Sequence, residues 1–136
     1  IMSFLMLLFP GLGPEEPEKP KMPDPIRIVA LADIEGEGNF TEGIISTYAD
    51  WKASIFGSQD DIYSEEFFNS NSLAVFVVTR PDSGTDVEIE SVVENGNTVT
   101  VTYNLVSKDF GATMICYSVV FATVSKNITT LSQVEI

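Results

Sequence analysis

The chain of 136 residues has no histidine and a single cysteine, Cys116. Zinc sites of the Cys/His type, Ser-His-Asp triads, Cys-His dyads and intramolecular disulfides all require residues that this sequence does not supply. Cys116 lies within an apolar run over residues 114–124, which indicates a buried and inert thiol. We therefore predict that the protein is not an enzyme and that it holds no cofactor.

Positive charge is also scarce, because seven Lys and Arg residues face 20 Asp and Glu residues and leave a formal net charge of -13. Nucleic-acid binding needs clustered basic side chains, whereas Lys52, Lys108 and Lys126 are scattered. The same charge opposes docking on anionic lipid head groups. We therefore exclude nucleic acid as a partner and expect membrane contact only through the N-terminal segment.

Proline is almost confined to one stretch, since six of the seven prolines lie between Pro10 and Pro25. The apolar residues 1–9 before it fit part of a secretory core of ~7–15 residues better than a bilayer span of ~20 residues. We interpret residues 1–9 as the remnant of a signal or membrane anchor, residues 10–25 as a proline-rich tether and residues 26–136 as one domain. This order predicts an extracytoplasmic protein, secreted or associated with the cell envelope.

Within residues 26–136, the apolar pattern predicts mostly β-structure. Thr47 and Gly57 bound a short helix with Asp50 at the third position of its cap, and Ser64 begins another turn or two. We predict an α+β fold with a mostly antiparallel sheet of five or six strands, a meander from Leu73 onward or a partly open barrel, and the helix packed on one face. Besides a hairpin, strands are expected at residues 26–31, 73–78 (central), 113–124 (apolar on both faces) and 131–136 (an edge).

The hairpin is expected over residues 85–106, where apolar and polar side chains alternate on both sides of a turn. The apolar side chains of both strands must lie on the same face, which places Val93 opposite Val99 and Ile89 opposite Tyr103. Residues 95–97 then form a three-residue loop or a two-residue turn followed by a bulge. A row of carboxylates then faces a row of threonines, in water or at a partner surface. This candidate interaction face consists of Asp86, Glu88, Glu90, Glu94, Thr98, Thr100 and Thr102.

The predicted core combines the helix with the centres of the strands. Tyr48, Trp51 and Ile55 share one helix face at spacings of three and four residues, which gives that face a stripe to bury. The other side chains expected to be buried are Phe67 or Phe68, Val75, Val77, Val101, Tyr103, Val119 and Phe121.

Two acidic loops are candidates for binding a cation, but the one at residues 60–66 lacks the alternating ligands and central glycine of a calcium loop, and the signal of the other is equally weak. We interpret both as solvated or helix-capping acids and keep a small-ligand or calcium-binding module as the alternative function. The loops contain Glu35, Glu37 and Glu42, and Asp60, Asp61, Glu65 and Glu66. The outward acids of residues 86–94 imply no cleft for glycoside cleavage. Asn39 and Asn127 begin glycosylation acceptor triplets.

A block over residues 62–78, Ile-Tyr-Ser-Glu-Glu-Phe-Phe-Asn-Ser-Asn-Ser-Leu-Ala-Val-Phe-Val-Val, precedes Ser83-Gly84, the hairpin and a last apolar strand. In this order the chain resembles a small extracytoplasmic domain of hypothetical proteins and lipoproteins of clostridia-like bacteria. More distantly, it is similar to the C-terminal domain family named for the protease-complex subunit PrcB. The resemblance implies a non-enzymatic accessory domain that binds or stabilises another cell-surface or periplasmic protein, and it supplies no catalytic residues.

Overall fold

The computed structural model describes residues 23–34, 42–58, 62–108 and 114–136, and every structural statement below concerns these residues. The signal or anchor remnant and nearly all of the predicted tether lie outside them. No helix in the described part of the chain is long and apolar enough to cross a bilayer.

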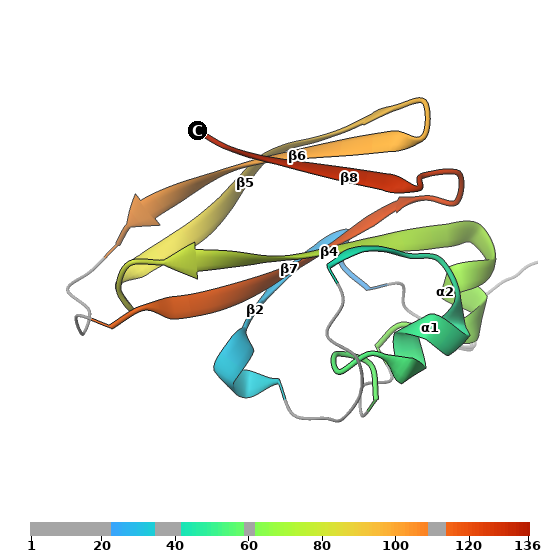
Figure 1. Ribbon diagram of the computed structural model, residues 1–136, viewed down its shortest axis with the longest axis horizontal. Coiled ribbons are helices and arrows are strands. Elements are labelled where there is room, and N and C mark those ends of the chain that lie inside the picture. The colour runs from blue at the N-terminus through green and yellow to red at the C-terminus, as the bar shows by residue number, and fades with distance from the viewer. Residues whose placement is uncertain (1–22, 35–41, 59–61, 109–113) are drawn as a thin grey trace, which may run out of the picture.

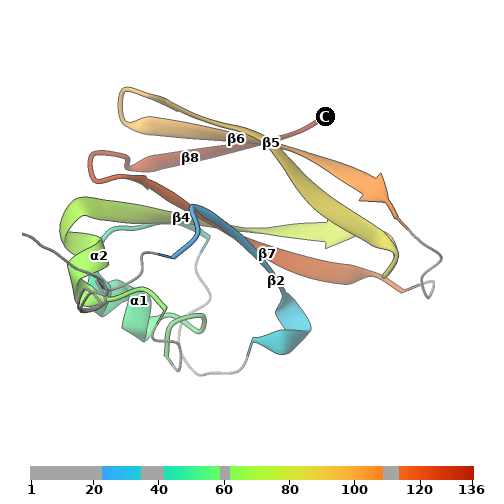
Figure 2. The same cartoon turned by 180° about the vertical axis from the view of Figure 1, so that it is seen from behind.

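The described strands form two open sheets that lie on one another as layers (Figures 1 and 2). The first sheet has the order β2 (Ile26–Ala30), β7 (Cys116–Ser125), β4 (Asn71–Arg80) and β3 (Gly43–Ile45), and all its pairs are antiparallel. The second sheet has the order β5 (Thr85–Asn95), β6 (Thr98–Ser107) and β8 (Thr130–Glu135). In it β5 and β6 are antiparallel, whereas β6 and β8 are parallel.

The mostly antiparallel architecture is confirmed, but the single meander or partly open barrel of five or six strands is wrong. The described residues contain seven strands, two α-helices, α1 (Tyr48–Ala53) and α2 (Glu65–Ser70), and a short 3-10 helix, η1 (Leu31–Asp33). The reason is that β4 and β7 are apolar on both faces and need a layer on each side, whereas the hairpin has only one face to bury. The chain therefore leaves the first sheet after β4 and returns to it with β7.

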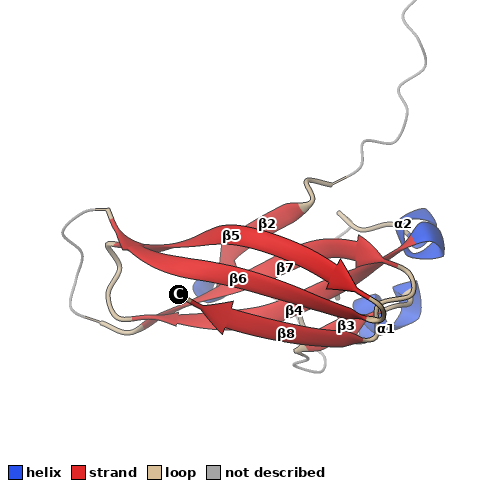
Figure 3. Cartoon of the chain, turned by 90° about the horizontal axis from the view of Figure 1, so that it is seen from above, coloured by secondary structure: helices blue, strands red, loops and turns tan. Residues whose placement is uncertain are grey.

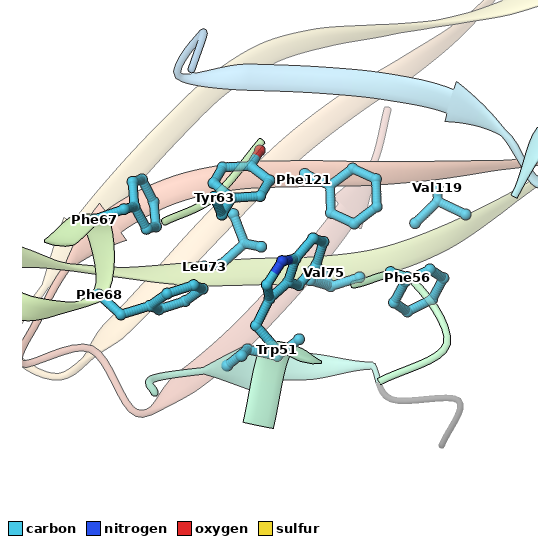
Figure 4. Packing of buried hydrophobic residues seen from close by; sticks show 10 residues of the cluster. Trp51, Phe56, Tyr63, Phe67, Phe68, Leu73, Val75, Val119 and Phe121 are labelled. Atoms are coloured by element: carbon cyan, nitrogen blue, oxygen red, sulfur yellow. The ribbon is translucent and has the colours of Figure 1, made fainter. Parts of the chain in front are cut away.

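One face of the first sheet packs against the two α-helices and forms the helix-side core (Figure 4). The Trp51 ring lies edge-on to the Tyr63 ring at 5.1 Å and to the Phe121 ring at 5.9 Å between centroids. The Arg27 guanidinium lies 5.3 Å from the centroids of both the Tyr63 and the Phe121 rings, a distance at which cation–π attraction acts. The buried members are Ile45, Trp51, Phe56, Tyr63, Phe67, Phe68, Leu73, Val75, Val119 and Phe121.

The other face of the first sheet packs against the second sheet and forms the inter-sheet core. Its buried members are Ala74, Phe76, Val78, Val87, Val99, Val101, Val120, Ala122, Val124 and Ile128. Of the helix stripe predicted to be buried, Trp51 is buried, whereas Tyr48 and Ile55 are only partly covered and Ile55 lies beyond the end of α1. Of the other side chains predicted to be buried, Val77 and Tyr103 are only partly covered, and the remaining strand residues and both phenylalanines are buried as expected.

Both predicted helix starts are confirmed. The Asp50 N–H donates to Thr47 Oγ1 at 3.1 Å, and the Phe67 N–H donates to Ser64 Oγ at 3.1 Å. The first helix ends at Ala53, earlier than predicted, because the Ser54 N–H and hydroxyl both donate to Trp51 O. Gly57 packs so closely on Trp51 that a Cβ there would lie 2.6 Å from two indole carbons, and a glycine is needed for this contact.

The hairpin register was predicted correctly in its first half only. Ile89 lies opposite Tyr103 as expected, but Ser91 pairs with Thr102 next, so Glu90 is an extra residue in a bulge. Beyond the bulge Val93 lies opposite Thr100, not Val99. The turn is a two-residue loop of Gly96 and Asn97 between the paired residues Asn95 and Thr98, with Gly96 at φ +64°.

Deletion of Glu90 tests the bulge. The shortened strand should keep Val87, Ile89 and Val92 on the buried face, because the deletion removes only the unpaired residue. We expect the variant to unfold cooperatively at a urea midpoint near that of the parent. Deletion of Val92 is the matched control, since it would turn Ser91 toward the core, and it should lower the midpoint sharply. Equal loss of stability in both variants would show that the register has no bulge at Glu90.

The Phe121→Ala substitution tests the helix-side core. Phe121 is 3% exposed and contacts the rings of Trp51, Phe56 and Tyr63, so truncation should leave a cavity and lower the free energy of unfolding by ~3–5 kcal/mol. Chemical denaturation monitored by tryptophan fluorescence measures this change. A loss below ~1 kcal/mol would contradict the packing of Phe121 between the sheet and the helices.

Candidate functional site

The second sheet packs on the first through one face only, and the opposite face, here called the outer face, is not covered by any described element (Figure 3). Its residues are those that alternate with the inter-sheet core along the three strands. They are Asp86, Glu88, Ser91, Val93 and Asn95 on β5, Thr98, Thr100, Thr102, Asn104 and Val106 on β6, and Thr130, Ser132 and Val134 on β8. In contrast, the central strands of the first sheet are covered on both faces over most of their length, and exposed side chains such as Tyr117 and Ile28 lie toward its margins.

One end of the outer face is charged. Glu88 and Lys108 form an ion pair at 2.8 Å, and both side chains are nearly half exposed. The hydrogen bond to Glu88, followed by the charges of Glu88 and Asp86, raises the pKa of the Lys108 ammonium against a smaller desolvation effect. Asp86 and Glu90 are exposed, and within the described residues neither forms an ion pair. This end of the sheet therefore has surplus negative charge.

The centre of the outer face is uncharged and carries the threonine row. Thr100 lies between Val93 of β5 and Ser132 of β8, and Thr102 lies between Ser91 and Val134. The two valines are 55% and 41% exposed. The sequence expectation placed carboxylates opposite these threonines, and the bulge at Glu90 is the reason that they face Ser91 and Val93 instead.

Glu94 is separated from the other predicted face residues. It lies opposite the fully buried Val99, on the inner side of the sheet, and its Oε2 accepts a hydrogen bond from the Ser125 N–H at 3.1 Å. This bond joins the end of β5 to the end of β7 in the other sheet. Glu94 is thus a structural residue that connects the two layers.

Sequence reasoning missed the exposure of Val93 and the neutral centre of the face. The signal that could have revealed both is the dipeptide Val92-Val93. Because successive side chains of a strand point to opposite faces, either valine could be the buried one. Val92 packs in the inter-sheet core, and Val93 faces solvent.

The acidic loops give little support for a cation site within the described residues. The described residues contain no group of three or more Cys, Asp and Glu side chains placed to hold a metal. Glu42 Oε2 accepts a hydrogen bond from the Val77 N–H at 2.9 Å. Glu65 and Glu66 lie in the first turn of α2, where negative side chains stabilise a helix through its dipole. The candidates Glu35, Glu37, Asp60 and Asp61 lie outside the described residues.

Of the two possible glycosylation positions, Asn39 also lies outside the described residues. Asn127 has a structural contact, since its Nδ2 donates to Gly96 O at 2.9 Å. The bond fixes the connection between β7 and β8 against the turn of the hairpin.

A hollow of about 380 Å³ lies between α1 and α2 and was not predicted. Its lining includes Tyr48, Glu65, Asn69 and Lys126. The Lys126 ammonium donates to Phe68 O at 2.7 Å and to Ser46 O, so this charge already holds the backbone of both helical segments. The hollow is open to solvent and lined mostly by exposed side chains, and it brings together no catalytic set.

Every basic side chain in the described part of the chain has an intramolecular partner. Arg27 lies over aromatic rings, Arg80 Nη1 donates to Thr85 O at 2.9 Å, Lys108 pairs with Glu88, Lys126 binds backbone carbonyls, and Lys52 also has a partner. Among the residues that the structure describes, the exposed carboxylates of Asp86 and Glu90 form no ion pair, so the unneutralised charge near the outer face is negative.

Comparisons with known proteins add no relative, since neither a family model, nor a curated protein, nor a solved structure matches the chain. The resemblance described from the sequence stays a prediction, and the residues above must be judged on their own chemistry.

The Tyr103 phenol gives a test of how β8 lies beside the hairpin. Burial, and then the negative charge of Glu135 on the paired strand, raise the pKa of Tyr103. Glu135→Gln should therefore lower this pKa toward the ordinary tyrosine value without reaching it. Ultraviolet difference titration, assigned with Tyr103→Phe, measures the change, and Asp86→Asn is the control that should have no effect.

The sign of the accompanying stability change also follows. A raised pKa favours the neutral phenol in the folded state, so this contribution is complete below the unfolded value near 10 and falls as the pH rises above it. An unchanged titration of Tyr103 in the Glu135→Gln variant would contradict the parallel register of β6 and β8.

Proposed function

We propose that this domain is a non-enzymatic accessory module that binds another protein through the outer face of the second sheet. The observation that carries the proposal is the combination of an uncovered sheet face with a neutral centre and an acidic end. Thr100, Thr102, Val93 and Val134 form the centre, Asp86 and Glu88 supply the carboxylates of the face, and the exposed Glu90 adds a third in the bulge of the same strand.

The shape of the face favours a protein over a small molecule. Small ligands bind in concave sites that bury most of their surface, and an open sheet offers no such enclosure. A protein interface instead combines an uncharged centre with a polar rim. Exposed valines beside threonine hydroxyls fit that centre, and the carboxylates at the end of β5 fit the rim.

The charge of the face selects the kind of partner. Because the described basic side chains are already engaged within the molecule, exposed carboxylates dominate the field near β5. A partner with Lys or Arg opposite this end would be attracted and oriented by it, and an acidic partner would be repelled. The partner is therefore proposed to be a basic protein surface.

The proposed cellular location of this binding rests on the sequence alone. The apolar residues 1–9 and the proline-rich residues 10–25 support a domain held outside the cytoplasm, and the partner would then be a cell-surface or periplasmic protein. The resemblance to small extracytoplasmic domains supports the same proposal.

Site-specific photocrosslinking tests the proposal. Thr100→Cys in a Cys116→Ser background carries a benzophenone at the centre of the face, and the labelled chain is irradiated in an extracytoplasmic extract of the source organism. We expect one saturable protein adduct, which is then purified and titrated against the parent. Glu66→Cys with the same label is the control, because α2 lies on the far side of the first sheet (Figure 1).

Charge variants then test the acidic end with the purified partner. Asp86→Asn combined with Glu88→Gln should weaken binding by about tenfold, mainly through slower association, and binding should also weaken as salt is raised. Glu65→Gln with Glu66→Gln makes the same change of net charge on α2 and should leave the affinity nearly unchanged. Equal effects of the two pairs, or an adduct formed equally from both label positions, would contradict the proposed surface.

A further inference from the structure

The strands at the ends of the two sheets differ in how well their free backbone edges are protected. Natural proteins protect such edges with short strands, charges or bulges. Strand β5 has the bulge at Glu90 and several carboxylates, and β3 has only three residues. Beyond β3, Glu42 occupies the Val77 N–H on the open edge of β4.

Strand β8 has little of this protection. Its six residues Thr130–Glu135 form the last strand of the second sheet, and no described strand pairs with its other side (Figure 3). Glu135 is its only charged residue, there is no bulge in its pairing with β6, and all its residues except Leu131 are exposed. The remaining edge strand, β2, is one residue shorter, carries Arg27 and has three partly buried residues, whereas five of the six residues of β8 are exposed, so among the described edges we take β8 as the one most open to pairing.

The hydrogen bonds to β6 show which backbone groups of β8 remain free. The Thr130 N–H donates to Asn97 O at 3.1 Å, and the Ile136 N–H donates to Tyr103 O at 2.9 Å. Even-numbered residues thus direct their backbone groups to β6. Because these groups alternate along a strand, Leu131, Gln133 and Glu135 direct their N–H and C=O groups to the open edge.

We propose that β8 pairs with β8 of a second copy of this chain, antiparallel and about a twofold axis at Gln133. In this register Gln133 lies opposite Gln133 of the partner copy, and Leu131 lies opposite its Glu135. Every residue of the strand then lies opposite a residue of the partner copy. The free N–H and C=O groups of Leu131, Gln133 and Glu135 all form hydrogen bonds to that copy. The two second sheets become one continuous sheet whose outer strands are the two β5 strands.

Charge disfavours the register shifted toward Glu135, and strand length disfavours the one shifted toward Leu131, which would leave residues 133–135 without an opposite residue in the strand. An axis at Glu135 would place two carboxylates directly opposite one another, which destabilises a strand pair. With the axis at Gln133 the two Glu135 residues are offset by four positions, about 13 Å along the strand, beyond the screening length of about 8 Å at physiological salt. The acidic ends near Asp86 lie on β5, at the far edges of the joined sheet, so their charge opposes this contact only weakly.

The dimer goes beyond the proposed function, because it would present two acidic contact faces side by side. Pairing along one short strand buries less surface than a stable interface needs, so the association should be weak and visible only at high protein concentration. Two weakly joined faces bind a repeated or dimeric partner more tightly than one face does.

The oligomeric state of the purified chain tests the pairing. Sedimentation equilibrium should show the average mass rising from 14.9 kDa toward twice that value as the protein concentration increases. Gln133→Pro removes an N–H that points to the open edge and spares the ladder to β6, as proline is tolerated on edge strands. This variant should remain monomeric, whereas Gln133→Ala, which keeps the N–H, should dimerise like the parent.

A folding control accompanies these variants. Both should retain cooperative unfolding and the raised pKa of Tyr103, which reports that β8 still lies beside β6. A chain that remains at 14.9 kDa at every concentration, or a Gln133→Pro variant that dimerises as the parent does, would overturn the proposal.

Disulfide formation tests the register. In a Cys116→Ser background, Gln133→Cys places two cysteines opposite one another across the axis, with Cα atoms about 5.5 Å apart and within disulfide range. Mild oxidation should give a covalent dimer from this variant. Thr130→Cys should not crosslink, because the two copies of residue 130 lie about 20 Å apart along the strands. Equal crosslinking of both variants would overturn the assigned register.

Salt separates this proposal from the proposed function. Higher ionic strength screens the repulsion between two acidic chains and should strengthen the dimer, while it should weaken binding to a basic partner. Asp86→Asn with Glu88→Gln should reduce partner binding and leave the Gln133 crosslink intact. Loss of the crosslink in that variant would show that the two copies meet through the outer face instead of the β8 edge.

Discussion

Strands β4 and β7 determine the architecture, because both are apolar on their two faces and lie side by side in the middle of the first sheet. Neither face can remain in water without a large loss of hydrophobic stabilisation. The helices and their aromatic rings cover one face, and the hairpin with β8 covers the other. Once the second sheet has used one face for this purpose, its other face is the large uncovered surface among the described elements.

The connection between β7 and β8 holds these layers together at one end. The Ser125 N–H donates to Glu94 of the hairpin, the Asn127 amide donates to Gly96 O, and Ile128 is 1% exposed in the inter-sheet core. Next to them the Lys126 ammonium binds the backbone of the helical layer. Polar residues that looked like candidates for glycosylation or ligand binding thus serve to fix the loops.

Local signals in the sequence predicted the individual elements well. Side-chain caps at Thr47 and Ser64 depend on residues close in sequence, and so does the alternation that revealed the hairpin. The central place of β4 followed from its apolar faces, and β8 lies at an edge as expected. These features need no knowledge of distant contacts.

The division into two sheets and the bulge depended on contacts between distant residues. The pattern of residues 113–124 is equally compatible with pairing to β6 or to β4, and only the need to cover both faces decides between them. The bulge at Glu90 was concealed by Val92-Val93, so the candidate face was predicted in the right place but with its carboxylates and threonines wrongly paired. Parallel pairing of β8 left no local signal at all.

The central claim is that the outer face of the second sheet is open while the centres of β4 and β7 are covered on both faces, and methyl resonances measure this directly. A soluble paramagnetic agent should broaden the methyl signals of Val93 and Val134, which are 55% and 41% exposed, and leave those of Val75 and Val101 sharp, since these are 0% exposed. Protection of Val93 and Val134 equal to that of Val101 would mean that another layer covers the outer face, and it would contradict this account of the fold and of its contact surface.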